Sequence, residues 1–177
     1  LPPVIDGGMC GSFESSGIHY DADGRRLTGR ILYYESSRGC PYKCAYCLSS
    51  LTQRIRAKPA EKTLCDLLKF ESLPYEVNIV KFVDRTFNFN RMRAKEIWRG
   101  LLSPEYTKRY HFEICAELLD EESFELLASF PRGKIQLEIG VQSTNPETLR
   151  RIHRSLDTDR LLGAISKLHS FGNMRIH

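Results

Sequence analysis

Cys40-Pro41-Tyr42-Lys43-Cys44-Ala45-Tyr46-Cys47 places three cysteines within eight residues, directly after the apolar run Ile31-Leu32-Tyr33-Tyr34. Thiolate sulfur is the soft ligand typical of iron-sulfur clusters, zinc sites and Cu(I) sites. Three sulfurs from one short loop can hold three corners of a 4Fe-4S cubane and leave the fourth iron open for chemistry. Ferredoxins and structural zinc sites normally add a fourth ligand, and no other Cys or His stands close to this loop in the sequence. The loop therefore predicts a metal centre with an open position.

The composition is that of one globular domain. The chain has 177 residues, of which 41% are hydrophobic and 27% are charged. It has neither an apolar run long enough to span a bilayer nor a secretory signal, so we expect a cytoplasmic protein without a membrane partner. Cys10, Cys65 and Cys115 are scattered, which fits a reducing compartment better than a disulfide framework.

The net charge of +4 is mild, and the basic residues are spread over several segments. This distribution favours solvated helix and loop faces over a nucleic-acid interface, although a basic face for RNA or another anionic partner stays open.

Strand and helix patterns alternate after residue 30, which predicts a parallel sheet of the α/β class. We expect residues 1–30 to be a linker or irregular segment, with a hairpin turn at Asp21–Gly24 between Ile18–Tyr20 and Arg30–Tyr33. The expected strands are Ile31–Glu35, Val77–Val83, Tyr110–Cys115, Ile135–Gly140 and Met174–His177. The expected helices are Glu61–Leu73, Arg91–Leu102, Glu121–Phe130, Pro146–His153 and Asp159–Phe171.

The strands separate apolar from polar residues, since alternate side chains point to opposite faces. In the third strand Phe112 and Ile114 alternate with His111 and Glu113. In a barrel wrapped by helices, the apolar set packs outward and the polar set lines the interior. Sites of parallel βα folds lie at the carboxyl ends of the strands. The cysteine loop and the residues that end the later strands, namely Asp84, Glu117 and Gln142, are therefore candidates.

The cysteine loop resembles the signature of the radical S-adenosylmethionine (SAM) enzymes, C-x3-C-x-aromatic-C, in Cys40, Cys44, Tyr46 and Cys47. The surrounding segments are similar to the cobalamin-domain-associated branch of that superfamily: Tyr34-Glu-Ser-Ser-Arg-Gly-Cys40, Val80-Lys-Phe-Val-Asp-Arg-Thr-Phe87 and Leu137-Glu-Ile-Gly-Val-Gln-Ser143. The resemblance implies a partial (β/α) barrel over residues 31–177, truncated in or before strand five of six.

The resemblance also implies cofactors and ligands. Cys40, Cys44 and Cys47 would hold a 4Fe-4S cluster, and SAM would bind beside it. Tyr46 matches the aromatic position next to the adenine.

The other SAM contacts implied by the resemblance lie on the later strands. Asp84 occupies the segment that binds the ammonium group, with Glu113 as the alternative. Gln142 and Arg154 match polar residues that contact SAM from the fourth strand and the following helix. The family's usual glycine-rich acidic segment is replaced here by Val83-Asp-Arg-Thr-Phe87, and no catalytic residue is assigned.

Three functions follow from these patterns. The resemblance implies an enzyme that reductively cleaves SAM to a 5′-deoxyadenosyl radical, with cobalamin-dependent methyl transfer as one outcome. It would need a reducing electron donor such as flavodoxin or ferredoxin, and its substrate is not encoded in any pattern found. A methylthiotransferase-like enzyme acting on RNA or protein is the second function. The third is a non-enzymatic zinc module that binds nucleic acid.

Overall fold

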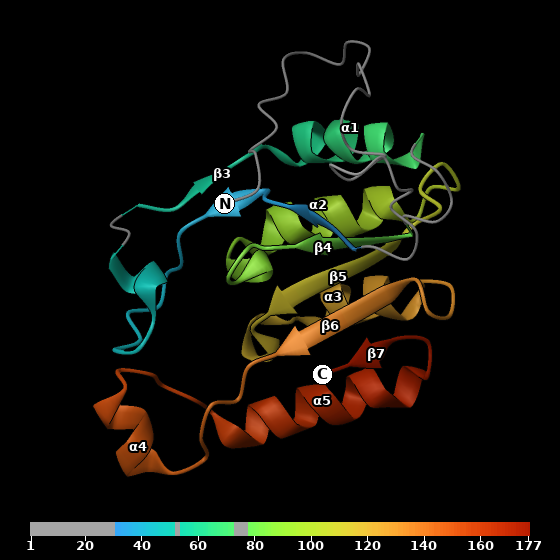
Figure 1. Ribbon diagram of the computed structural model, residues 1–177. Coiled ribbons are helices and arrows are strands. Elements are labelled where there is room, and N and C mark those ends of the chain that lie inside the picture. The colour runs from blue at the N-terminus through green and yellow to red at the C-terminus, as the bar shows by residue number, and fades with distance from the viewer. Residues whose placement is uncertain (1–30, 52–53, 73–77) are drawn as a thin grey trace, which may run out of the picture.

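A computed structural model describes residues 31–51, 54–72 and 78–177 of the protein (Figure 1). Its main sheet is parallel throughout and has the strand order β1-β4-β5-β6-β7. The strands are β1 (Ile31–Tyr34), β4 (Ile79–Phe82), β5 (Arg109–Ile114), β6 (Ile135–Ile139) and β7 (Arg175–Ile176). The helices are α1 (Ala60–Glu71), α2 (Arg91–Leu101), α3 (Glu121–Ala128), α4 (Pro146–Arg151) and α5 (Thr158–Phe171).

Each of the five predicted strands and five predicted helices is present, so the α/β class is confirmed. The predicted ends at Leu73 and Val77 lie outside the described residues, and the other ends shift by at most a few residues. The helix ends follow the expected capping chemistry. Asp120 accepts a hydrogen bond from the backbone N–H of Ser123, and Asn145 does the same for the first turn of α4. Gly172 ends α5 in the left-handed conformation at φ 63°, which glycine adopts at little cost.

Two features differ from the expectations. A small antiparallel ribbon, β2 (Ser37–Arg38) with β3 (Arg56–Ala57), flanks the cysteine loop and is too short to give a sequence pattern. Cys65 is disulfide-bonded, whereas we expected reduced thiols. The expected hairpin around Asp21–Gly24 lies outside the described residues. Within the described ranges, no helix is both long and apolar enough to cross a membrane.

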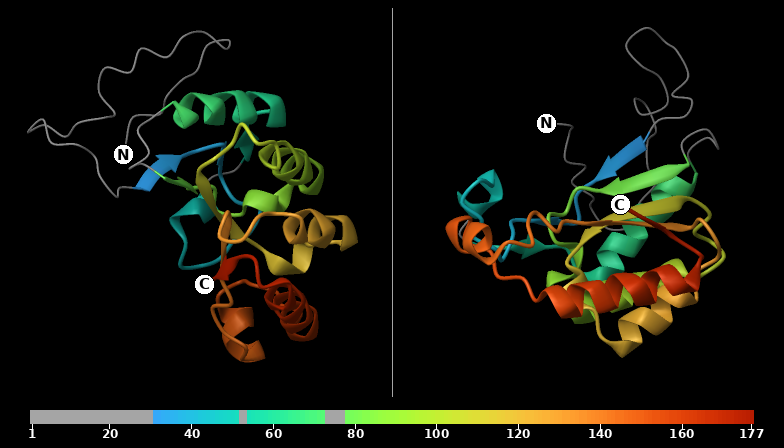
Figure 2. Two further views of the ribbon diagram at one scale, coloured as in Figure 1. Left: turned by 90° about the vertical axis from the view of Figure 1, so that its right-hand side faces the viewer. Right: turned by 90° about the horizontal axis from the view of Figure 1, so that it is seen from below.

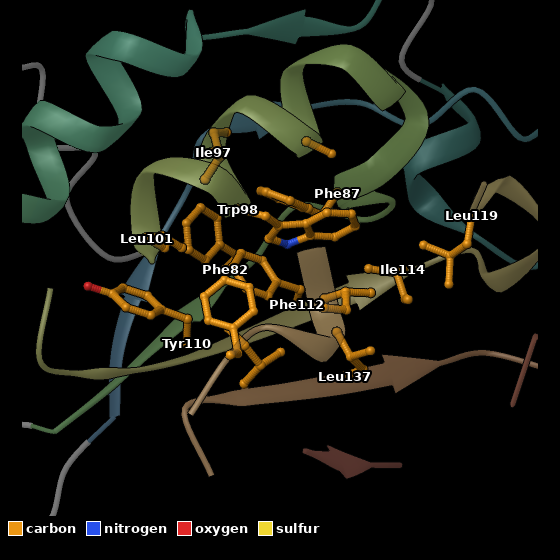
Figure 3. Packing of buried hydrophobic residues seen from close by; sticks show 14 of the residues in the cluster. Phe82, Phe87, Ile97, Trp98, Leu101, Tyr110, Phe112, Ile114, Leu119 and Leu137 are labelled. Atoms are coloured by element: carbon orange, nitrogen blue, oxygen red, sulfur yellow. The ribbon is translucent and has the colours of Figure 1, made fainter. Parts of the chain in front are cut away.

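The core lies between the sheet and the helices that cover one of its faces (Figures 2 and 3). Aromatic rings fill its centre: Phe87 lies between Phe82, Phe112 and Trp98, with ring centroids 5.1, 4.4 and 5.7 Å away. All four residues are fully buried. Aromatic pairs in these offset and tilted arrangements add stability beyond the burial of their area.

One face of the sheet is apolar and the other is polar, as the alternation of residues in the strands predicted. Residues of β5 alternate between half-buried and buried, and only the buried set faces the helices. The other face carries polar side chains that lie side by side in the strand register: Lys81 opposite His111, His111 opposite Gln136, and Glu113 opposite Glu138. In the part of the chain that the structure describes, no helix covers this polar face (Figure 2).

Candidate metal and cofactor site

The cysteine loop lies at the carboxyl edge of the sheet, next to α4 (Figure 1). The backbone N–H of Ala45 donates to the carbonyl of Ile152, which joins the loop to the residue after α4 at 3.0 Å. The Sγ atom of Cys40 lies 3.4 Å from Oγ1 of Thr86, just beyond β4. Cys40, Cys44 and Cys47 are all free thiols. The loop is thus held by two segments that are distant in the sequence.

The donor set consists of three free thiols on one short loop. Among the described residues, no three Cys, His, Asp or Glu side chains are already gathered around a single point. In a 4Fe-4S cluster three cysteines each bind a different iron and leave the fourth iron open, whereas a structural zinc site needs a fourth protein ligand. The cysteine loop supplies the three ligands that such a cluster requires.

Tyr42, inside the cysteine loop, connects the loop to the end of β5. Its hydroxyl donates to the thiol of Cys115 at 3.3 Å. Cys115 is buried and is fixed in turn by Asn88, whose side chain accepts from its N–H at 2.9 Å and donates to its carbonyl at 2.8 Å. Burial and the Cys115 neighbour raise the pKa of Tyr42, so the phenol stays a proton donor. This chain of contacts sets where the loop sits on the sheet edge.

Gln142 lies just past β6 in a strained backbone conformation. Its φ is 66°, which side-chain-bearing residues seldom adopt and which is found preferentially at functional sites. Its Nε2 atom would lie 2.8 Å from a Cβ placed on Gly140, so Gly140 provides the space that the amide occupies. The sharp turn after the strand thus aims an amide across the strand end.

Arg154 reaches the same strand end from the turn after α4. His153 takes the left-handed conformation at φ 55°, and the N–H of Arg154 donates to the carbonyl of Leu149. This helix-ending motif turns the Arg154 side chain back to the sheet, where Nη2 donates to the carbonyl of Gly140 at 2.7 Å. Its Nε is buried without a protein partner. An acceptor supplied by a ligand would satisfy that orphan donor.

Tyr46 lies beside Cys44, on the same loop. Burial and the nearby Cys44 thiol raise the pKa of Tyr46, and the Arg154 guanidinium opposes that shift. Tyr46 and Arg154 are therefore neighbours, although they are far apart in the sequence. The structure brings together the cysteines, Tyr46, Gln142 and Arg154 at one edge of the sheet.

Asp84 has a different environment. It follows Phe82 by two residues and shares its helix-facing side, where it is 0% exposed. Its carboxylate accepts from the Ser36 N–H at 2.8 Å, the Ser36 hydroxyl at 2.6 Å and the Ser37 hydroxyl at 2.5 Å. The buried guanidinium of Arg93 donates to the Ser36 hydroxyl at 2.8 Å and extends this network. Asp84 is thus occupied by partners within the protein, and as a SAM ligand it stays a prediction.

Glu113 lies on the polar face of the sheet. Its Oε2 is 4.0 Å from a nitrogen of Arg85, which is too far for a hydrogen bond. Burial and the charge of Glu138 raise the pKa of Glu113. Among the described residues, the carboxylate therefore has only a long ion pair to Arg85.

Glu138, in contrast, is closely paired. Its Oε2 accepts from Nζ of Lys81 at 3.0 Å and lies 3.2 Å from Nε2 of His111, without a well-aligned hydrogen bond to that ring. The Lys81 hydrogen bond holds the pKa of Glu138 below its usual range. A cationic ligand on this face would therefore meet Glu113 and not Glu138.

Some residues that build the site had no sequence signal. Tyr42 is the variable position of a cysteine motif, and Asn88 lies in a short turn. Arg93 belongs to the polar residues of α2, which the sequence pattern predicts to be exposed to solvent, yet it is buried. Cys115 was expected to be a small buried residue, which it is, but its hydrogen bond from Tyr42 depends on strand register and was not foreseeable.

Comparisons with known proteins agree with this geometry. The sequence profile of the Radical SAM superfamily matches residues 34–174. The ribosomal protein uS12 methylthiotransferase RimO of Roseiflexus sp. (strain RS-1) is 26% identical over 162 residues, which cover 82% of this chain and 32% of that protein. The uncharacterized methyltransferase PH0819 of Pyrococcus horikoshii is 25% identical over 141 residues, which cover 77% of this chain and 30% of that protein. The chain thus spans about a third of the curated relatives that it matches.

Several solved structures share the fold, and two of them are cobalamin-containing radical SAM enzymes. The radical SAM methyltransferase TsrM of Kitasatospora setae, solved with cobalamin and a 4Fe-4S cluster, has a TM-score of 0.68 at 16% identity. The match covers 84% of this chain and 30% of TsrM. The cobalamin-dependent radical SAM enzyme OxsB, with aqua-cobalamin bound, has a TM-score of 0.63 at 21% identity, covering 82% of this chain and 23% of OxsB. The predicted barrel type is therefore confirmed.

Proposed function

The chain belongs to the Radical SAM superfamily, and we propose that it holds a 4Fe-4S cluster through Cys40, Cys44 and Cys47 and binds SAM beside it. Members of the superfamily are enzymes that use these two cofactors. When bound, the cluster supplies the electron that cleaves the sulfonium bond of SAM. The observation that carries the proposal is the position of three free thiols at the same sheet edge as an amide and a guanidinium with an orphan donor.

The chain's own residues would bind and orient SAM. Arg154, with its buried unpaired Nε–H, fits the methionyl carboxylate through charge-assisted hydrogen bonds. Gln142 offers an amide from the other side of Gly140. Glu113, with no close cation, fits the methionyl ammonium better than Asp84 does, because three donors already occupy Asp84. Tyr46 provides a ring beside the cysteines for the adenine.

Anaerobic reconstitution tests the cluster. We expect about four irons per chain and broad visible absorption, both lost when any of Cys40, Cys44 or Cys47 becomes serine. Cys115→Ser is the matched control, because this free thiol lies outside the motif and a serine hydroxyl can still accept the hydrogen bond from Tyr42, so the variant should keep the full iron content. One tightly bound zinc without sulfide, or iron loss in the control alone, would overturn the cluster assignment.

Gly140→Ala tests the SAM pocket without touching a proposed ligand. The new Cβ would meet only the far end of the Gln142 side chain, so the amide would move while the fold stays intact. We expect unchanged iron content, a small change in thermal stability and at least a severalfold loss of SAM affinity. Gly163→Ala is the control, because a Cβ there meets nothing within 4 Å. Equal SAM affinity in both variants would exclude Gln142 from the pocket.

Two reactions are favoured by different relatives. The structural likeness to TsrM, whose structure holds cobalamin, and to the cobalamin-dependent enzyme OxsB supports cobalamin-dependent methyl transfer. The sequence likeness to RimO supports methylthiolation of a macromolecule, which would require a second cluster elsewhere in the protein. Cobalamin uptake and iron content of the whole protein separate them: about four irons with cobalamin favours the first, and about eight irons without it favours the second.

A further inference from the structure

The segment that carries the cysteines is strongly basic. Residues 36–60 contain five basic residues and neither Asp nor Glu, whereas the whole chain has a net charge of only +4. The five are Arg38, Lys43, Arg54, Arg56 and Lys58. Arg38 and Lys58 form ion pairs with Glu35 and Asp66, whereas Arg54 and Arg56 are exposed.

The ribbon beside the loop places two of these charges against each other. Arg38 of β2 lies directly opposite Arg56 of β3 in the antiparallel register, and both side chains are exposed. Glu35 neutralises Arg38 through hydrogen bonds at 2.5 to 3.1 Å. The exposed Arg56 is therefore the charge that this ribbon offers to an anionic surface.

The same segment presents apolar side chains to solvent. Leu48 is 84% exposed and Leu51 is 77% exposed, both in the short 3-10 helix η1 (Leu48–Leu51) that directly follows Cys47. The cysteine loop connects this segment to α4, since the Ala45 N–H donates to the carbonyl of Ile152 just after that helix. Helix α4 adds Arg150 and Arg151, each 77% exposed and paired with Glu147. Two exposed leucines surrounded by arginines are typical of a protein docking surface.

The leucines distinguish a protein partner from RNA. RNA is bound through phosphate contacts and base stacking on aromatic or arginine side chains, and exposed leucines contribute little to either. An acidic protein uses both elements, because its carboxylates are steered by the arginines and its apolar centre covers the leucines. Transient electron-transfer complexes need only a small interface of this kind.

We propose that a small acidic electron-transfer protein docks on the surface made of Leu48, Leu51, Arg54 and Arg56 together with α4, and that it reduces the cluster from there. This inference rests on the proposed function, since it names the partner of that cluster. With flavodoxin as donor, the anionic flavin hydroquinone loses one electron and becomes the neutral semiquinone. The oxidised cluster gains that electron, going from 2+ to 1+, and no proton is transferred.

Binding to the cluster-free protein tests the surface independently of the cluster. Immobilised protein is titrated with oxidised flavodoxin, by biolayer interferometry at low and moderate salt. Arg54→Glu/Arg56→Glu and Leu48→Ser/Leu51→Ser are compared with the charge-matched control Arg109→Glu/Arg132→Glu at the amino-terminal edge of the sheet. We expect the arginine reversal to weaken binding about tenfold or more and to remove most of its salt dependence. The leucine variant should weaken binding at both salt concentrations.

Stopped-flow reduction of the reconstituted protein completes the test. Flavodoxin hydroquinone should reduce the cluster about tenfold more slowly in the arginine variant, whereas dithionite, which needs no docking, should reduce all variants alike. Flavodoxin binding that is equal in both arginine variants would overturn the proposal. A salt-dependent shift of RNA by the wild type, in the absence of flavodoxin binding, would assign the surface to nucleic acid. A protein that takes up no cluster but still binds flavodoxin at this surface would refute the proposed function and leave the docking surface standing.

Discussion

Replacing Asp84 by alanine should destabilise the protein severely and affect SAM binding only through that loss of stability. The substitution leaves the Ser36 N–H and the hydroxyls of Ser36 and Ser37 without their acceptor. It also leaves the guanidinium of Arg93, 6% exposed, without the nearby negative charge. Removing one member of a buried charged network costs about 3 to 5 kcal/mol. At 2 to 4 °C per kcal/mol for a chain of this size, the melting temperature should fall by about 6 to 20 °C.

Chemical denaturation of the cluster-free protein measures the cost directly. Asp157→Ala is the control, because that aspartate is exposed and only caps α5 through the Arg160 N–H, which is worth about 1 kcal/mol. In a double-mutant cycle, Asp84→Ala and Arg93→Met should be non-additive, since they belong to one network. If Asp84→Ala costs less than 1 kcal/mol and abolishes SAM binding to the reconstituted protein, Asp84 is the ammonium ligand and the buried-network reasoning is wrong.

Arg154→Ala should weaken SAM binding by about 1.5 to 3 kcal/mol in anaerobic calorimetry and leave the iron content unchanged, and unaltered affinity would remove Arg154 from the pocket. Glu113→Gln should raise the melting temperature of the ligand-free protein at about pH 8 but not at about pH 4, because burial and Glu138 raise the pKa of Glu113. The stability that the neutral Glu113 carboxyl confers is complete below its unfolded pKa and is lost as the pH rises through its folded pKa. A melting-temperature difference between Glu113→Gln and the wild type that is the same at both pH values would contradict the raised pKa of Glu113. Asp120→Ala should destabilise the protein at neutral pH, because the Ser123 hydrogen bond lowers the pKa of Asp120 to about 2. That contribution is present above the unfolded pKa of about 4 and disappears as the pH falls through about 2. A difference in melting temperature between the wild type and Asp120→Ala that stays the same in acid would contradict this reasoning.

The periodicities of the sequence were enough to predict the sheet and its helices, because each element buries one regular stripe or face. The alternation in β5 correctly separated Phe112 and Ile114 from His111 and Glu113. It did not identify the role of Asp84. A buried carboxylate at a strand end can be assigned a structural role only when its hydrogen-bond partners are known. The partners are Ser36, just after β1, and Arg93 of α2, and no local sequence pattern predicts these contacts.

The candidate site was predictable only where its chemistry is local. The three cysteines form a motif within eight residues, and the prediction that they bind a metal centre needs no tertiary information. The orientation of Arg154 depends on the left-handed residue His153, and that of Gln142 depends on the missing side chain of Gly140. Both are three-dimensional facts that one sequence does not reveal, so their assignment rested on the family resemblance.

The contacts that hold the cysteine loop imply an order of maturation. Its ligands are adjacent in the chain, but Thr86 lies 46 residues beyond Cys40, Cys115 lies 73 beyond Tyr42, and Ile152 is more distant still. During synthesis the thiols leave the ribosome well before these supports and pass through a period in which nothing fixes their spacing. Metal inserted at that time would meet a loop of unfixed geometry, and other thiols could compete with it for the metal. If the loop holds the proposed cluster, accurate loading requires that α4, which ends at Arg151, has docked, and delivery of iron and sulfide would then be a late event in the life of the polypeptide.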